Sequence, residues 1–232
     1  IIPRTLLLMG GAIAALDHVM KCGGIAGNMA GGTHHAHYDF GSGYCIFNDL
    51  AVCSRLALSK YQLTRIAIID FDVHQGDGTA TILQNVDEVL TISMHCQQNF
   101  PFRKSESDFD LVLPANAGDD EVLAVVARAL DITREFDPEL ILFQAGVDGL
   151  ATDALGKLNM SRLGMSKRNE MVFELVQELS IPAVVFMGGG YSKPISHTID
   201  AFSDLFLSAY RANNQILSRV NVSTSTSLID HN

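Results

Sequence analysis

The chain has few charged residues, no basic cluster and no long apolar run. Charged side chains make up 18% of its 232 residues and hydrophobic ones 47%, whereas about a quarter of a typical soluble domain is charged. The formal net charge is −10, so direct binding to the phosphates of a nucleic acid is not expected. No apolar run approaches the roughly 20 residues that a membrane span needs. The low charged fraction predicts a large buried core. The lack of a basic cluster and of a long apolar run predicts that the protein binds neither nucleic acid nor a membrane.

Cysteines are also few. Cys22, Cys45, Cys53 and Cys96 include no C-x-x-C pair and show no spacing typical of a disulfide framework. We therefore expect free thiols that serve as small core residues. The compartment that fits is a reducing, intracellular one, the cytoplasm or, in a eukaryote, the nucleus.

The segment after Arg4 superficially resembles a signal peptide, because it is apolar and contains an Ala-x-Ala sequence. Several of its apolar residues nevertheless recur at helical spacing: Leu6, Met9, Ile13, Leu16 and Met20. This periodicity predicts an amphipathic helix over 6–21, and we favour that interpretation.

Strands alternate with helices along the chain. The apolar pattern predicts strands at 65–71, 89–94, 111–113, 139–144 and 182–187. It predicts helices at 6–21, 48–60, 78–85, 119–136, 161–179 and 193–211. No repeat or linker separates them, so we expect a single-domain α/β fold, an open and mostly parallel sheet with helices on both faces. The domain is expected to cover 1–212, followed by a flexible C-terminal tail, 213–232, rich in Ser, Thr and Asn.

The stretch IAIIDFDVHQGDG, residues 66–78, carries a dense set of polar side chains directly after a buried strand. Such groups are costly to bury unless something pairs with them. Asp72 and His74 alternate in the strand period, so their side chains leave on the same side and can share one cation. The alternative is that Asp77 caps a helix and that the other residues are ordinary loop polars.

Three glycine-bearing segments, 70–78, 146–153 and 188–191, each follow a predicted strand. The carboxyl ends of parallel strands meet at one edge of a sheet, where ligands bind. Asp148 in the second segment is the natural third ligand, although alone it would be taken for a turn residue. Two carboxylates and one imidazole leave positions open for water and substrate, as a catalytic metal requires.

His34 and His35 are adjacent in a long glycine-rich loop, 23–45, of a length that is usually functional. They are open to three interpretations: metal ligands, a general acid and base, or exposed polar residues. Asp70 and Asp77 are available to orient one histidine each, which favours catalysis. Tyr191 follows three glycines, and such a turn can direct its phenol into a site. The Gly-Gly-Gly-Tyr motif is weak evidence by itself, and the default interpretation is a surface tyrosine.

Four motifs, in this order and spacing, resemble the zinc-dependent histone deacetylase superfamily: GGTHHAHYDFGSGYC-x-x-ND, IDFDVHQGDGT, QAGVDGLATDALG and MGGGY. The similarity runs over about residues 10–210. Gln75 stands where many members have a second histidine, which is most similar to the class IV branch and some bacterial relatives. The resemblance implies an arginase/deacetylase-like fold. The family's N-terminal strand and a rim loop bearing a substrate-gripping aspartate lie outside the region of similarity.

The resemblance also implies the metals. It matches Asp72, His74 and Asp148 to the ligands of one zinc ion. It matches a second set of residues to a potassium site beside the zinc: Asp70, Asp72, Ser93 and Met94.

The catalytic and substrate-binding groups are implied in the same way. His34 and His35 match the general acid and base, with Asp70 and Asp77 as their carboxylate partners, and Tyr191 matches the residue that hydrogen-bonds the substrate carbonyl. The positions expected to border the acyl-amine substrate are Gly43, Tyr44, Phe100 and Gly189.

The implied activity is removal of an acetyl or longer acyl group from the ε-amine of lysine, or from a related amine such as a polyamine. Two alternatives stay open. A ureohydrolase-like enzyme with two manganese ions has a similar fold, but Gly76 and the single aspartate at Asp148 offer too few carboxylates for a second metal. A non-catalytic module that binds acyl-lysine or another partner is disfavoured, because every expected catalytic position is occupied.

Overall fold

The computed structural model describes residues 1–227. Within these residues the centre is a six-stranded sheet with the order β1-β6-β5-β2-β3-β4, in which every paired strand is parallel. The strands are β1 Ile25–Asn28, β2 Ile66–Asp70, β3 Val89–Cys96, β4 Phe109–Leu113, β5 Leu140–Gln144 and β6 Ala183–Phe186. The helices are α1 Ile2–Cys22, α2 Asp49–Tyr61, α3 Asp77–Leu83, α4 Asp119–Phe136, α5 Arg162–Leu179 and α6 Ser196–Ser227.

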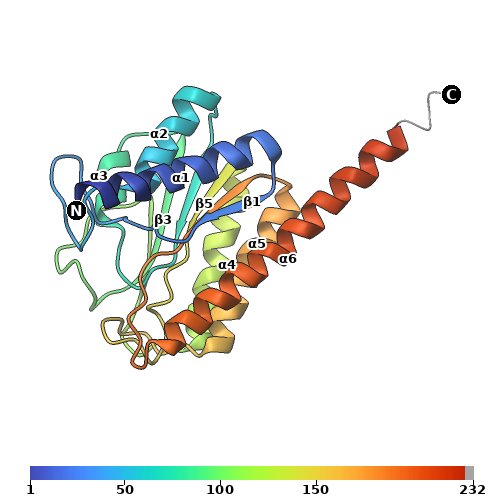
Figure 1. Ribbon diagram of the computed structural model, residues 1–232. Coiled ribbons are helices and arrows are strands. Elements are labelled where there is room, and N and C mark those ends of the chain that lie inside the picture. Colours follow the sequence, from blue (N-terminus) through green and yellow to red (C-terminus); the bar gives the residue numbers. More distant parts are fainter. Residues whose placement is uncertain (228–232) are drawn as a thin grey trace.

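Helices cover both faces of the sheet, α1 to α3 on one side and α4 to α6 on the other (Figure 1). Successive strand residues point to opposite faces. In β2, Ile66 and Ile68 pack among residues of α1 and α2, whereas Ala67 and Ile69 pack among residues of α4 and α5. Both faces are apolar, so the strand is a continuous apolar run. The predicted α/β class is confirmed.

One strand was not expected. Ile25–Asn28 forms β1 at an edge of the sheet, paired with β6, whereas we predicted only loop over 23–45. Its sequence, IAGN, is short and contains a glycine, which gives little strand signal. The ladder to β6 and the packing of Phe206 over Gly27 hold it in place. The tertiary partner, and not the local sequence, makes this segment a strand.

The last helix is longer than predicted. α6 continues to Ser227, although we expected it to end near Arg211 and a flexible tail to begin at 213. Its middle is anchored, since Ala212 is buried in the core and its carbonyl accepts a hydrogen bond from Gln177 of α5. Residues 228–232 of the predicted tail lie outside the described residues.

The first helix forms as expected, and Met9 and Leu16 of its predicted apolar face are buried together with Ala12 and Val19. Leu6, which we also placed on that face, is 57% exposed. By length and composition alone α1 is apolar enough to cross a membrane, which we had not expected of any segment. Core helices of globular proteins pass the same test, and one side of α1 packs on the sheet. We therefore describe α1 as a core helix.

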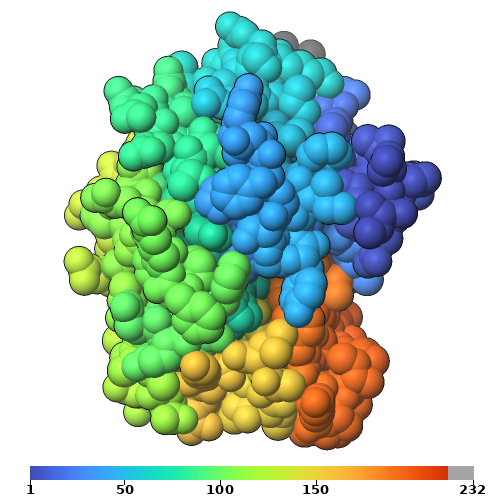
Figure 2. Space-filling model, turned by 90° about the vertical axis from the view of Figure 1, so that its left-hand side faces the viewer, coloured from blue at the N-terminus to red at the C-terminus, as the bar shows by residue number. Residues whose placement is uncertain are grey.

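The carboxyl ends of β6, β5 and β2 are neighbours in the sheet, so the loops that follow them meet at one edge. The 29–48 loop after β1 and the 97–108 loop after β3 join them there. Figure 2 looks onto this side, where blue, green, yellow and orange segments surround a central hollow. This hollow contains the predicted site.

Candidate active site

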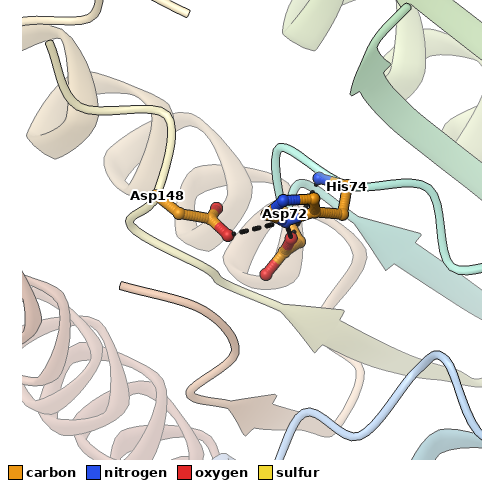
Figure 3. A group of neighbouring side chains, drawn as sticks. All are labelled: Asp72, His74 and Asp148. Atoms are coloured by element: carbon orange, nitrogen blue, oxygen red, sulfur yellow. Dashed lines mark hydrogen bonds and ion pairs between the residues drawn. The ribbon is translucent and has the colours of Figure 1, made fainter. Parts of the chain in front are cut away.

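The three predicted metal ligands point toward one another (Figure 3), and all three line the cavity at this edge of the sheet. Asp72 and His74 come from the loop after β2, and Asp148 comes from the loop after β5. Their ligand atoms all lie within 4.8 Å of one another. His74 Nδ1 is 3.0 Å from Asp72 Oδ1 and 3.1 Å from Asp148 Oδ2. Residues far apart in the sequence thus present two carboxylates and an imidazole to one point.

Backbone amides and glycines hold the two carboxylates in place. The Val73 N–H donates to Asp148 Oδ1 at 2.9 Å, and the Gly189 N–H donates to Asp72 Oδ2 at 2.8 Å. A Cβ at Gly146 would collide with Asp72 Oδ2, and one at Gly189 would collide with Asp148 Oδ2. Only glycine therefore allows the backbone to approach the carboxylates this closely.

The electrostatics of this cluster fit a divalent cation. Asp72 and Asp148 are buried, and no lysine or arginine side chain of the described residues hydrogen-bonds to either. Burial and the neighbouring Asp72 charge raise the pKa of Asp148 to about 7. Burial opposes protonation of His74, but the hydrogen bonds to Asp148 and Asp72 outweigh it and raise the pKa of His74 to about 10. The cluster therefore holds protons that a metal would displace, and its ligand types are those that zinc accepts.

Two histidine–aspartate pairs lie beside the cluster. His34 Nδ1 is 2.7 Å from Asp70 Oδ2, and His35 Nδ1 is 2.6 Å from Asp77 Oδ1. The two imidazole rings are neighbours, with centroids 4.1 Å apart. The pairing is the one that the resemblance implies, while the catalytic roles of these residues stay predictions.

The environments of the two histidines push their pKa values in opposite directions. Burial disfavours the charged form of His34, but the carboxylates of Asp70 and Asp72 outweigh burial and raise its pKa to about 9. Burial and the adjacent His34 charge lower the pKa of His35 to about 4. In the absence of a metal, these shifts favour the charged form of His34 and the neutral form of His35 at neutral pH. Two titratable groups separated in this way suit an acid and a base.

A cavity of about 630 Å³ opens above the cluster. All four predicted substrate-binding residues line it, Gly43, Tyr44, Phe100 and Gly189. Phe100 packs edge-on against His35, with ring centroids 5.0 Å apart. Tyr44 is 92% exposed at the rim, so the two aromatic side chains lie at different depths. The cavity connects solvent to Asp72, His74 and Asp148 and to both histidines of the pairs.

Tyr191 also lines the cavity and is held there by a residue that we did not predict. The Tyr191 N–H donates to Asp153 Oδ2 at 2.6 Å, and Asp153 Oδ1 accepts from the amides of Leu155 and Gly156. Burial and the nearby carboxylates raise the pKa of the Tyr191 phenol above its usual value. The phenol therefore keeps its proton at neutral pH and can donate a hydrogen bond.

Asn99 is a second residue that the sequence analysis missed. It is buried, and its Nδ2 lies 3.2 Å from His74 Nε2 and donates to the Leu155 carbonyl at 2.8 Å. Its Oδ1 accepts from the Lys157 N–H at 3.0 Å. Asn99 thus joins His74, a predicted metal ligand, to the 153–157 turn. Its place just before Phe100 in a polar loop was the sole sequence signal.

Gln75 does not line the cavity, and its side chain bonds to Ser105 and Asp110 instead. Its Nε2 donates to the Ser105 carbonyl at 2.8 Å and to Asp110 Oδ1 at 2.7 Å, and its Oε1 accepts from the Ser105 N–H. The side chain is fully buried. Gln75 therefore acts on the loop that carries Phe100, an effect whose direction the sequence did not show.

The residues of the predicted potassium site are near neighbours. Asp70 of β2 lies opposite Ser93 of β3 in the ladder, and Met94 follows Ser93. All are buried together with Asp72. Both carboxylate oxygens of Asp70 accept hydrogen bonds, one from His34 and one from the Asp72 N–H at 3.1 Å. Potassium binding stays a prediction.

Comparison with known families matches residues 2–203 to the histone deacetylase domain. An uncharacterized protein of Picosynechococcus sp. (strain PCC 7002) is 44% identical over 200 residues, which cover 84% of this chain and 65% of that protein. Histone deacetylase 2 of Arabidopsis thaliana is 34% identical over 195 residues, which cover 82% of this chain and 50% of that protein. The chain therefore spans between half and two thirds of the length of these relatives.

A solved structure gives the same result for the fold. The crystal structure of a histone deacetylase homologue in complex with SAHA superimposes with a TM-score of 0.79 at 29% identity. The superposition covers 93% of this chain and 62% of the homologue. The arginase/deacetylase-like arrangement of strands and helices is thereby confirmed.

Proposed function

Because this chain belongs to the histone deacetylase family, we propose that it is a zinc-dependent amidohydrolase. Its substrate is an amine, the ε-amine of lysine or a related amine, that carries an acetyl or longer acyl group. One observation carries the proposal: a buried Asp72–His74–Asp148 cluster lies at the base of an open cavity beside two histidine–aspartate pairs.

Asp72, His74 and Asp148 would hold the zinc ion, which supplies Lewis-acid activation of the substrate carbonyl and of a water molecule. Asp77 Oδ1 accepts a hydrogen bond from the Nδ1–H of neutral His35, which leaves the Nε2 lone pair available. In the proposed reaction His35 Nε2 accepts the proton of the attacking water. Charged His34 then protonates the departing amine, which would otherwise leave poorly.

Tyr191 has one role in this proposal, and the aromatic side chains of Tyr44 and Phe100 have another. The phenol of Tyr191 donates a hydrogen bond to the carbonyl oxygen, on which negative charge develops during attack. A donor placed there typically contributes about 3–4 kcal/mol to the transition state. Tyr44 and Phe100 provide apolar walls for the aliphatic part of the substrate.

The test combines metal analysis with a substrate panel. The purified protein is assayed on acyl-lysine peptides of increasing chain length and on acetylated polyamines, with zinc quantified in the same sample. We expect about one zinc per chain and turnover that a chelator abolishes. Bound zinc without turnover on any member of the panel would favour a binding module instead.

The ligand set is tested by Asp148→Ala. Loss of one of the three ligands should abolish both zinc binding and turnover. Asp87→Ala is the matched control and should change neither. Asp87 is exposed and precedes β3, at the edge of the sheet opposite the cavity. Retention of zinc and activity in Asp148→Ala would rule out this ligand set.

A further inference from the structure

The two histidine–aspartate pairs differ in what holds the second oxygen of the aspartate. In the first pair, Asp70 Oδ2 faces His34 and Asp70 Oδ1 accepts the backbone N–H of Asp72 at 3.1 Å. In the second pair, Asp77 Oδ1 faces His35 and Asp77 Oδ2 lies 3.2 Å from Nε2 of His37. Within residues 1–227, His35 and His37 are the hydrogen-bond partners of the Asp77 carboxylate. The second carboxylate oxygen of Asp77 is therefore held by a side chain, whereas that of Asp70 is held by a backbone N–H.

His37 is itself held on several sides. Its Nδ1 is 2.8 Å from Oγ1 of Thr81, one helical turn after Asp77 on α3. The imidazole ring of His37 stacks on Phe40 with centroids 4.2 Å apart and planes 17° from parallel. The backbone N–H of His37 donates to the Phe40 carbonyl at 3.0 Å. Only 14% of the side chain is exposed. The imidazole is therefore fixed and able to act as an anchor.

We propose that His37 is a positioning residue for the hydrolysis: it fixes the Asp77 carboxylate so that Oδ1 stays aligned with His35 Nδ1. The carboxylate torsion of an aspartate is soft, so a carboxylate with one partner can rotate away from it. The orientation of His35 depends on this bond, and a base that is not held loses efficiency. His37 does not line the cavity, so it acts through Asp77 and not on the substrate. The role in catalysis rests on the proposed function, whereas the anchoring of Asp77 does not.

The anchoring can be measured without substrate. Short imidazole–carboxylate hydrogen bonds give N–H proton resonances downfield of the amides, and the zinc-loaded protein should show one for His34–Asp70 and one for His35–Asp77. Asp77→Asn assigns the second. In His37→Ala we expect the His35 resonance to move upfield and to exchange with water at least tenfold faster, while the His34 resonance serves as an unchanged internal control.

Three results would overturn the anchoring: an unchanged His35 resonance in His37→Ala, equal changes in both resonances, or no protected His35 resonance in the unaltered protein. His197→Ala is the matched control, since His197 is exposed on α6, and should leave both resonances in place. Because no turnover is required, a failure of the proposed hydrolysis is distinguished from a failure of this inference.

The kinetic consequence is tested with the same variants. His37→Ala should lower kcat about tenfold, the lower end of what outer-shell partners of active-site histidines contribute, with KM and zinc content within twofold. His37→Gln keeps a donor near Asp77 and should recover most of kcat. Thr81→Val removes the hydroxyl that bonds to His37, together with its bonds to the Asp77 and Gly78 carbonyls within α3. It should cause a smaller loss, which tests the proposal even if His37→Ala fails to fold. Unchanged kcat in both His37→Ala and Thr81→Val, or a rise in KM alone, contradicts the catalytic role.

Discussion

Arg168 of α5 is the largest of the fully buried side chains, and it ties together the two loops that carry the metal ligands. Its Nη1 donates to the carbonyls of Gly146 at 2.7 Å and Phe71 at 3.2 Å, and its Nη2 donates to the Ala145 carbonyl at 3.2 Å. Phe71 directly precedes a predicted zinc ligand, and Gly146 lies two residues before another. We therefore predict that Arg168→Met strongly destabilises the protein.

The expected magnitude follows from two opposing effects. A hydrogen bond to a charged group contributes about 1.5–3 kcal/mol, so the three bonds to carbonyls contribute about 4–9 kcal/mol. Burial lowers the pKa of Arg168 to about 10, a desolvation cost of roughly 3 kcal/mol. Methionine removes the favourable and the unfavourable effect together and leaves the carbonyls without this donor. The free energy of unfolding should fall by about 3 kcal/mol.

Urea unfolding at neutral pH measures this difference, with a chelator present so that metal binding does not add to stability. Arg162→Met is the matched control. Arg162 also makes several side-chain bonds, to Asp204 and Asp200, but it is exposed, so its loss should cost less than about 1 kcal/mol. A cost for Arg168→Met no greater than for this control would refute the reasoning.

Three further predictions concern the site and its surroundings. Tyr191→Phe should lower kcat about a hundredfold, the equivalent of about 3 kcal/mol, with zinc content unchanged; an unaltered kcat would remove the phenol from the mechanism. Gln75→Ala should release the loop that carries Phe100 and raise KM for an acyl-lysine peptide about fivefold without weakening zinc binding, as steady-state kinetics and metal titration would show. Burial lowers the pKa of His95 to about 4, so the unfolded chain takes up a proton that the folded protein does not. The free energy of unfolding should therefore fall by up to about 3 kcal/mol as the pH drops from about 6.5 towards 4. Urea unfolding in the presence of a chelator should show a smaller fall for His95→Phe over that range.

The elements with a strong apolar period could be predicted from local sequence. The helix predicted over 119–136 is α4 with the same bounds. The helix predicted over 161–179 is α5, which Ser161 caps by accepting a hydrogen bond from the Gly164 N–H. These helices pack through their own periodic apolar residues, so the apolar pattern specifies both the helix and the face that it buries. β1 has no such pattern and depends on β6. The turn of α6 that follows Arg211 likewise depends on contacts with α5, which Ala212 and Gln215 make.

The sequence by itself predicted which residues form the candidate site and at which edge of the sheet they lie, because strand period and alternating topology restrict where loops can meet. It also indicated the two histidine–aspartate pairings through the resemblance of its motifs. Only the tertiary structure decided that Asn99 touches His74, that Gln75 holds the 97–108 loop, and that His37 shares Asp77 with His35. The physical reason is the short range of a hydrogen bond: a residue's partner depends on ångström-scale packing between loops, and no period in the chain encodes that distance.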